Sequence, residues 1–490
     1  MARKKDEEEE DEPMSPTGRM MQTPKFNVCI VILMGFYTKI DPILFKKCVQ
    51  QALLKHPRFC SILVTSRGRY TWRRTAVDID KHLFVPDVSA ARESPDEFVS
   101  EYASRLSEIP LDAAAKPLWE IHILNVKASD AEAVVLMKIH HSLGDGVSLI
   151  ALTHACSRKL DDPAALPVLP PPSKKLREEG GGGGRGMFKF LWMVILILFY
   201  TLVDVAEFVA TLLFLRDVQT PVRAGRGVRL CRKRFVHRIV SLDDVKFIKN
   251  AMNVSINDVV LGVTEAGLSR YLNSIYVNNK KNVAENKEKN SNCLPQNLGI
   301  RSTVIFNLRP STTIEDMAKM LEKEEVNGML GNKIAMVLLP FTIALQDDPL
   351  TYIRRAKSTM DRKKVSIAHQ CAYVTMKLTT SLFGTKAAAR LTRAVFRNTT
   401  FTFSNVMGPA EEVNLFGHHL RYIAPSVCGF PQSFIIHYQS YSNMIIISIG
   451  ADEKLIPNPD QLCDDMVKSL QNIKEAVKEK VLASASLDYC

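Results

Sequence analysis

The chain has 490 residues, 46% of them hydrophobic, and single hydrophobic cores stop growing at roughly 250–300 residues, so we expect two domains. Its 64 Lys and Arg residues against 52 Asp and Glu residues leave a net charge of +12. This favours an anionic partner such as a nucleic acid, an anionic bilayer or a phosphate-bearing molecule. The ten cysteines include no C-x-x-C pair and no zinc-finger spacing with histidine, which argues against a metal knuckle and a disulfide framework.

The chain opens with an acidic segment, residues 1–12, in which Asp6 to Glu12 form an unbroken block of carboxylates. Such a block repels itself and cannot build a core, so we expect a disordered tail. The first residues lack the apolar stretch of a secretory signal, which favours a protein whose catalytic part faces the cytosol.

Residues 13–165 alternate between strand-like and helix-like segments, which is the pattern of a mixed α/β domain. We expect strands over residues 26–35 and 133–139, and helices over residues 41–54 and 147–156. The second strand runs directly into two histidines. Asp145 stands near the start of the helix that follows, where a carboxylate can cap it.

Residues 166–186 are rich in proline and then in glycine, so we expect a flexible linker and a domain boundary there. Residues 187–216 form a hydrophobic segment whose uncharged part, Phe190 to Val203, is shorter than the roughly 18–20 residues that a spanning helix needs. Asp204 and Glu207 follow on one helical face and would be costly at the bilayer centre. Basic residues flank the segment on both sides, which suits anionic headgroups. We therefore expect a membrane-associated helix in one leaflet, with a buried core helix as the alternative.

Residues 217–490 again mix both element types. We expect a helix over residues 255–272, an exposed loop over residues 278–292, and strands over residues 302–308, 401–405, 433–441 and 444–450. Ser255 or Asn257 could cap the helix. Ser442 and Asn443 separate the last two strands and predict a hairpin.

The strongest chemical signal is His140-His141-Ser142-Leu143-Gly144-Asp145-Gly146. A neutral imidazole can accept a proton from a hydroxyl group, which is general-base catalysis. The aspartate can hold the turn by an ion pair, and Gly146 would permit a close backbone approach or a positive φ. A metal site that pairs His141 with Asp145 lacks a third ligand at recognisable spacing, so we expect no metal.

Together with five further motifs, this sequence resembles the wax ester synthase/diacylglycerol acyltransferase family, within the CoA-dependent acyltransferases that share H-H-x-x-x-D-G. The match extends in the family's order from about Glu12 to about Leu470. The further motifs are Glu12-Pro13-Met14-Ser15-Pro16, Pro117-Leu118-Trp119, Asn257-Asp258, Asn307-Leu308-Arg309-Pro310 and Ser404-Asn405-Val406-Met407-Gly408-Pro409. The family often has proline where Met407 stands.

The resemblance implies two chloramphenicol-acetyltransferase-like α/β domains around a central channel, with the membrane-associated helix between them. It implies that His141 is the general base, that His140 supports the turn, and that Asp145 is structural and pairs with Arg309. Ser404 or Asn405 is the candidate donor to the oxyanion. Acyl-CoA would be the co-substrate, with no permanently bound cofactor, and the acceptor would be a long-chain alcohol or diacylglycerol.

If both halves close over one channel, the hydrophobic segment between them cannot cross the bilayer once. We expect it to lie in the membrane plane or to be re-entrant, with the catalytic domains cytosolic at the endoplasmic reticulum or the plasma membrane.

Three other interpretations remain open. A soluble CoA-dependent acyltransferase could act on another hydroxyl or amine, although the Asp-Phe-Gly-Trp-Gly motif of its plant relatives is absent from the sequence. A peptide-synthetase condensation domain uses the same motif but normally sits beside carrier domains. A non-catalytic lipid-binding protein would not need His141. Nucleic-acid binding is disfavoured, because the basic residues cluster beside an apolar helix.

Overall fold

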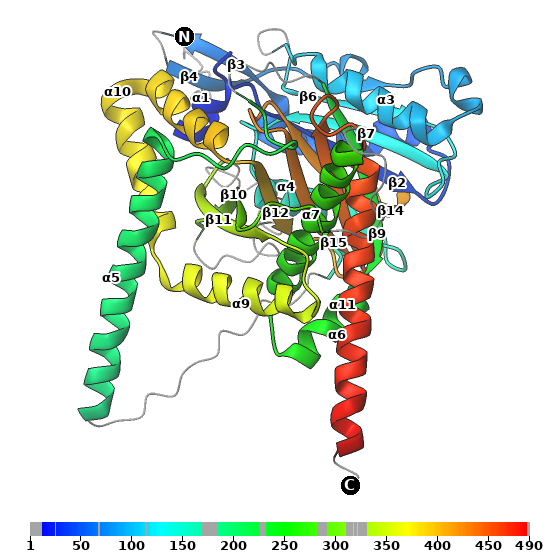
Figure 1. Cartoon of the computed structure of the whole chain (residues 1–490). Helices are drawn as coiled ribbons and strands as arrows, with labels where there is room; N and C mark the ends of the chain where they lie inside the picture. The colour runs from blue at the N-terminus through cyan, green and yellow to red at the C-terminus, as the bar shows by residue number, and fades with distance from the viewer. Residues whose placement is uncertain are drawn as a thin grey trace, which may run out of the picture.

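Two mixed β-sheets with helices around them make up the computed structural model, which describes residues 12–24, 26–66, 69–112, 116–168, 184–225, 232–281, 292–309, 317, 321 and 331–487 (Figure 1). The larger sheet has the order β5-β6-β7-β2-β14-β13-β8 and the smaller one β11-β10-β12-β15-β16-β9. A third, small sheet has the order β1-β4-β3. The mixed α/β architecture predicted from the sequence is therefore confirmed.

The strands have the following bounds: β1 Glu12–Pro13, β2 Cys29–Phe36, β3 Ser61–Ser66, β4 Arg69–Arg74, β5 Leu83–Phe84, β6 Trp119–Leu124, β7 Ala133–His140, β8 Ser157–Lys159, β9 Lys233–Ser241, β10 Leu298–Asn307, β11 Ile334–Ile343, β12 Phe401–Val406, β13 Val413–Leu415, β14 His418–Cys428, β15 Phe434–Tyr441 and β16 Met444–Asp452. The helices are α1 Pro16–Met21, α2 Pro42–Ala52, α3 Pro95–Glu108, α4 Gly146–Cys156, α5 Gly184–Leu213, α6 Leu242–Met252, α7 Ile256–Lys281, α9 Leu350–Val365, α10 Ala368–Asn398 and α11 Pro459–Leu487.

The centre of the larger sheet is the antiparallel pair of β2 and β7. Every residue of β7 is buried, which explains why its sequence is a continuous apolar run rather than an alternating one. Cys29 pairs with His140 at the end of this ladder. The two histidines of the motif therefore lie at the C-terminal end of a buried central strand.

The two halves of the chain interlock, and this departs from the division at residues 165 and 217. Strands β13 and β14 come from the C-terminal half but belong to the larger sheet, where β14 pairs with β2. The pattern of one strand shows only how much of it is buried. Its partner is chosen by tertiary packing, which the local sequence does not encode.

The smaller sheet is built from the predicted strands of the C-terminal half. The hairpin of β15 and β16 is present, and Ser442 at its turn has a φ of 50°. Helix α7 starts with a reciprocal cap, in which the Ser255 N–H donates to Asp258 Oδ2 at 2.7 Å and the Asp258 N–H to Ser255 Oγ at 3.2 Å. The loop predicted for residues 278–292 starts later than expected, because α7 continues to Lys281. Residues 282–291 lie outside the described part.

Glu12, which the sequence assigned to the acidic tail, lies instead in strand β1. It pairs with Trp72 of β4, and its carboxylate forms an ion pair with Arg58, whose side chain is largely buried. The carboxylate of Glu12 thus gives the buried guanidinium of Arg58 a partner. Residues 1–11 of the predicted tail, and residues 169–183 of the predicted linker, lie outside the described part.

The N-terminal part of helix α5 projects from the body of the protein, while its C-terminal part lies beside α10 (Figure 1). Its segment Met187–Leu213 is long and apolar enough to cross a membrane by length and composition alone. Within this described segment, Asp204 is the first buried residue. Asp204 contacts Lys363 of α9 at 2.8 Å, and Glu207 contacts the same ammonium at 3.4 Å. The two acids thus attach the C-terminal part of α5 to the body, while the residues from Met187 to Val203 are exposed or half-buried.

Candidate active site

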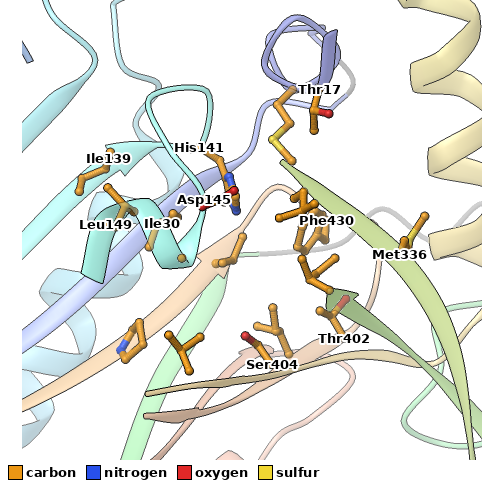
Figure 2. A pocket seen from close by; sticks show the side chains of 18 of the residues that line it. Thr17, Ile30, Ile139, His141, Asp145, Leu149, Met336, Thr402, Ser404 and Phe430 are labelled. Atoms are coloured by element: carbon orange, nitrogen blue, oxygen red, sulfur yellow. The ribbon is translucent and has the colours of Figure 1, made fainter. Parts of the chain in front are cut away.

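An apolar cavity of about 220 Å³ lies between the two sheets and is lined by both halves of the chain. The N-terminal half contributes residues of β2, β7 and α4, and the C-terminal half contributes residues of β11, β12, β15 and α10. Figure 2 shows His141 and Asp145 at the turn after β7, with Thr402 and Ser404 on β12. Both halves of the chain therefore line one cavity, as predicted.

His141 is held from both sides by hydrogen bonds. The backbone N–H of His141 donates to the carbonyl oxygen of Val28 at 2.9 Å. The ring atom Nδ1 lies 3.1 Å from Asn332 Oδ1. The Asn332 side-chain amide donates back to the carbonyl oxygen of His141 at 2.9 Å. With Asn332 Oδ1 as an acceptor, Nδ1 carries the hydrogen and Nε2 keeps its lone pair. This tautomer is the one that can accept a proton at Nε2.

Burial lowers the pKa of His141 below its ordinary value, although a backbone hydrogen bond, the nearby Asp145 carboxylate and the hydrogen bond to Asn332 Oδ1 act in the opposite direction. A lowered pKa keeps the imidazole neutral at physiological pH, which a general base requires.

His140 faces away from the cavity. Its Nε2 lies 2.9 Å from Asn27 Oδ1 and its Nδ1 lies 2.7 Å from Ser142 Oγ. Burial lowers the pKa of His140 to about 3, so the ring is neutral. With both nitrogens occupied, this histidine is suited to holding the turn.

Asp145 joins three segments of the turn region. It is the N-cap of α4, where Oδ1 accepts from the Ser148 N–H at 3.0 Å. Its Oδ2 accepts from Arg309 Nη1 at 2.6 Å and from the Lys333 N–H at 3.0 Å. Arg309 also donates to the carbonyl oxygen of Gly331 at 2.7 Å. The contact expected between Asp145 and Arg309 is thus in place.

Gly146 also lines the cavity, but it does not have the backbone geometry expected from the sequence. Its φ is not positive, and a Cβ added there would meet Val406 Cγ2 at 3.6 Å, which is ordinary van der Waals contact. Neither the positive φ nor the close backbone approach that we expected at Gly146 is present.

Ser404 and Asn405 point to opposite faces of β12, because successive side chains of a strand alternate. Ser404 lines the cavity. Asn405 instead donates its amide to Asn257 Oδ1 on α7 at 2.6 Å. Of the two oxyanion candidates, only Ser404 faces the site.

Two polar residues of the site were not predicted from the sequence. Asn332 lies 191 residues from His141 in the chain, and no local motif marks it. His437 lines the cavity from β15, where it pairs with Ser404. Burial, and to a lesser extent His141, lowers the pKa of His437 to about 3. Strand β15 was predicted, but it is buried on both faces, so no alternation showed which residues face the cavity.

A second, polar cavity of about 1700 Å³ adjoins the first, and Leu212 and Phe430 line both. Its basic residues are Arg216, Arg223, Arg232, Lys233, Arg393, Arg397 and Lys454. Arg232 is paired with Glu101 and Glu453, each at 2.8 Å. Among the residues that the structure describes, no ion pair is formed by Arg216, Arg393 or Arg397. These three guanidinium groups are available to an anionic ligand.

Two mixed sheets around one shared cavity, with a histidine in its wall, make up a chloramphenicol-acetyltransferase-like α/β fold. A wax ester synthase/diacylglycerol acyltransferase from Marinobacter aquaeolei VT8 has this fold, with a TM-score of 0.58 at 15% identity over 95% of this chain and 100% of that one. The first condensation domain of the calcium-dependent antibiotic synthetase follows with a TM-score of 0.53 at 12% identity, covering 92% of this chain and 91% of that one.

Sequence comparisons identify the family. The wax ester synthase/diacylglycerol acyltransferase catalytic domain matches residues 44–260, and the C-terminal domain of the same family matches residues 330–474. Wax ester synthase/diacylglycerol acyltransferase 11 of Arabidopsis thaliana is 44% identical over 96% of both chains. Wax ester synthase/diacylglycerol acyltransferase 6 of the same plant is 42% identical over 99% of this chain and 97% of its own. The chain therefore belongs to the wax ester synthase/diacylglycerol acyltransferase family, as its motifs predicted, and it is an acyltransferase.

Proposed function

We propose that the protein transfers a long-chain acyl group from acyl-CoA to the hydroxyl group of a long-chain alcohol or of diacylglycerol, with His141 as the general base. The observation that carries this proposal is the neutral imidazole in the wall of an apolar cavity, with Nδ1 occupied by Asn332. An apolar cavity suits both the acyl chain and a lipid acceptor.

In the proposed reaction, Nε2 of His141 removes the hydroxyl proton while the acceptor oxygen attacks the thioester carbonyl carbon. A carbon–oxygen bond forms, and the carbon–sulfur bond then breaks. The leaving thiolate takes the proton back from the imidazolium, which yields the ester and free CoA. Ser404 is the candidate hydroxyl donor to the negatively charged carbonyl oxygen.

The direct test supplies the purified protein with palmitoyl-CoA and, in separate reactions, a long-chain alcohol or diacylglycerol. We expect CoA release to be matched by ester with at least one acceptor. CoA release without ester would indicate a thioesterase. Ester or amide formed only with a small polar acceptor would favour the soluble-type acyltransferase. Absence of turnover combined with retention of lipid would favour a non-catalytic lipid-binding protein.

The donor would occupy both cavities. Its acyl chain fits the apolar cavity, and its phosphates match the guanidinium groups of Arg216, Arg393 and Arg397 in the polar cavity. The shared boundary at Leu212 and Phe430 is where the apolar and anionic parts of such a ligand would meet. Both the net charge of +12 and the family support acyl-CoA as the co-substrate.

Replacing Arg393 and Arg397 together with glutamine is expected to raise the KM for palmitoyl-CoA roughly 10-fold, because each loses a charge-assisted hydrogen bond to phosphate. The kcat should change little, since neither side chain reaches the imidazole. Initial rates at varied palmitoyl-CoA, at low and high salt, measure the effect. Lys478→Gln on α11, an exposed lysine, is the matched control. An unchanged KM in the double variant contradicts this donor site.

We also infer that α5 associates with one side of a membrane without crossing it. The part of α5 from Met187 to Val203, which precedes its first buried residue, reaches only about 25 Å as a helix, less than the roughly 30 Å of a hydrocarbon core. Residues on either side of α5 line one cavity, which requires both halves on the same side. In sealed microsomes, tags at both ends of the chain should be cut together by added protease. Protection of only one tag would contradict this arrangement.

A further inference from the structure

Helix α10 forms an outer wall of the apolar cavity and is kinked at Gly384, where φ is 79° and ψ is 168°. One face of its first part lines the cavity through Ala372, Tyr373, Met376 and Thr379. The same part exposes large apolar side chains elsewhere: Val374 at 52%, Leu378 at 54%, Leu382 at 72% and Phe383 at 73%. An apolar surface of this kind on a helix with a kink is unusual for a face that meets water.

A single layer of helices forms this wall. From residue 368 to residue 387, a fully described stretch, no side chain is buried. Helix α10 packs beside α5 (Figure 1), and Phe208 and Leu212 of α5 complete this side of the cavity. The cavity is therefore separated from the outside, on this side, by two helices that both expose apolar residues.

The charge of α10 has a single sign. Its sequence contains five basic residues and no acidic one: Lys377, Lys386, Arg390, Arg393 and Arg397. Lys377, Lys386 and Arg390 are exposed and do not line either cavity. Exposed leucine and phenylalanine together with unpaired cations are typical of a helix that lies in the headgroup region of an anionic bilayer.

We propose that α10 is a second membrane-docking element, which lies beside α5 in the interface of an anionic phospholipid bilayer and forms the entrance through which the lipid acceptor reaches the cavity. The proposal rests on the proposed function, since only a water-insoluble acceptor needs such an entrance. It goes beyond the association of α5, because it adds a second helix, far from α5 in the sequence, to the membrane-facing surface and places the acceptor's entrance between the two helices. The free energy of docking comes from the apolar side chains, and the headgroup charge adds to it.

The test uses the full-length protein and a variant with Leu378→Ser, Leu382→Ser and Phe383→Ser. In flotation with vesicles of phosphatidylcholine and phosphatidylserine, we expect the variant to bind roughly 10-fold more weakly, because three exposed apolar anchors are lost. Its rate with a long-chain acceptor in vesicles should fall similarly. Its rate with a short, water-soluble alcohol and no vesicles should equal that of the unaltered protein, because none of the three residues lines the cavity.

The matched control is Val481→Ser with Leu482→Ser. These residues are 45% and 70% exposed on α11, a helix that lies away from α10 in Figure 1, and we expect no change in either assay. A second variant, Lys377→Gln with Lys386→Gln and Arg390→Gln, should lose the gain in binding that phosphatidylserine confers over pure phosphatidylcholine.

Hydrogen exchange of the unaltered protein provides a readout that needs no substitution. Peptides from residues 368–387 should exchange more slowly when anionic vesicles are added. The proposal is overturned if these peptides show no protection, or if the α10 variant binds vesicles and uses the long-chain acceptor as the unaltered protein does. Failure of the proposed function is distinguishable, because the unaltered protein would then form no ester with any acceptor.

Discussion

Replacing His141 with alanine is expected to lower kcat for ester formation roughly 100- to 10,000-fold, which is the usual contribution of a positioned general base. The loss should appear in kcat, because the imidazole acts on the proton that moves in the transition state. The measurement is ester formed from palmitoyl-CoA at saturating substrate concentrations. His419→Ala serves as the matched control, since His419 is partly exposed, paired with Glu412 and outside the cavity.

The pH dependence offers an independent check on the same residue. Because the pKa of His141 is lowered, the base stays neutral down to pH 6.5, and kcat/KM should decline only below that value.

The pH dependence of the free energy of unfolding must be measured separately. Burial lowers the pKa of His140 to about 3 and of His56 to about 4. Both rings therefore stabilise the fold above about pH 6.5, and this stability is lost as the pH falls toward those values.

Two outcomes would remove His141 from the proposed mechanism. One is a His141→Ala protein that keeps more than about a tenth of the original kcat, well above the loss expected for a base. The other is a decline of kcat/KM that begins above pH 6.5 and is the same in the unaltered protein and in His141→Ala. A variant that is inactive because it unfolds would be recognised by its unfolding curve.

Replacing Asp145 with asparagine is expected to destabilise the protein by about 3–5 kcal/mol, the typical effect of leaving one partner of a buried ion pair alone. The side chain of Asp145 is 1% exposed and that of Arg309 is 5% exposed. Asparagine is as good an N-cap as aspartate, so the bond to the Ser148 N–H can be kept. The loss therefore reports on Arg309 and the Lys333 N–H.

Urea unfolding of the two proteins measures this effect. Arg354→Ala removes an exposed pair with Asp348, whose side chains are 52% and 49% exposed, and should cost only about 0–1 kcal/mol. We also expect a lower kcat for Asp145→Asn, because the turn that carries His141 loses its link to the C-terminal half. Equal unfolding curves for the Asp145 and Arg354 variants, with full activity, would show that the pair does not hold the turn.

Much of the local structure around the site could be predicted from the sequence. The apolar run before the two histidines indicated strand β7, and Asp145 was identified as the cap of α4 because capping depends on a few neighbouring residues. The contact between Asp145 and Arg309 was expected from the family resemblance, since the two residues are 164 positions apart. The contribution of Asn332 could not be predicted, because no residue pattern near it differs from an ordinary loop.

Tertiary structure also decided how the acids of the apolar segment are accommodated. The sequence indicated only that Asp204 and Glu207 would be costly in a bilayer. Lys363 of α9 pairs with both of them, which attaches this part of α5 to the protein. The cost of the charges is thus removed by a partner more than 150 residues away.

The sequence by itself indicated several of the strands and helices, the H-H-x-x-x-D-G motif, the apolar helix and the family, since these depend on neighbouring residues and ordered motifs. Only the tertiary structure decided that β14 joins the sheet of the first half, that Ser404 rather than Asn405 faces the cavity, and that Nδ1 of His141 is occupied. The reason is physical. Strand pairing, the face of β12 that meets the cavity and the tautomer of a histidine all depend on contacts between distant segments.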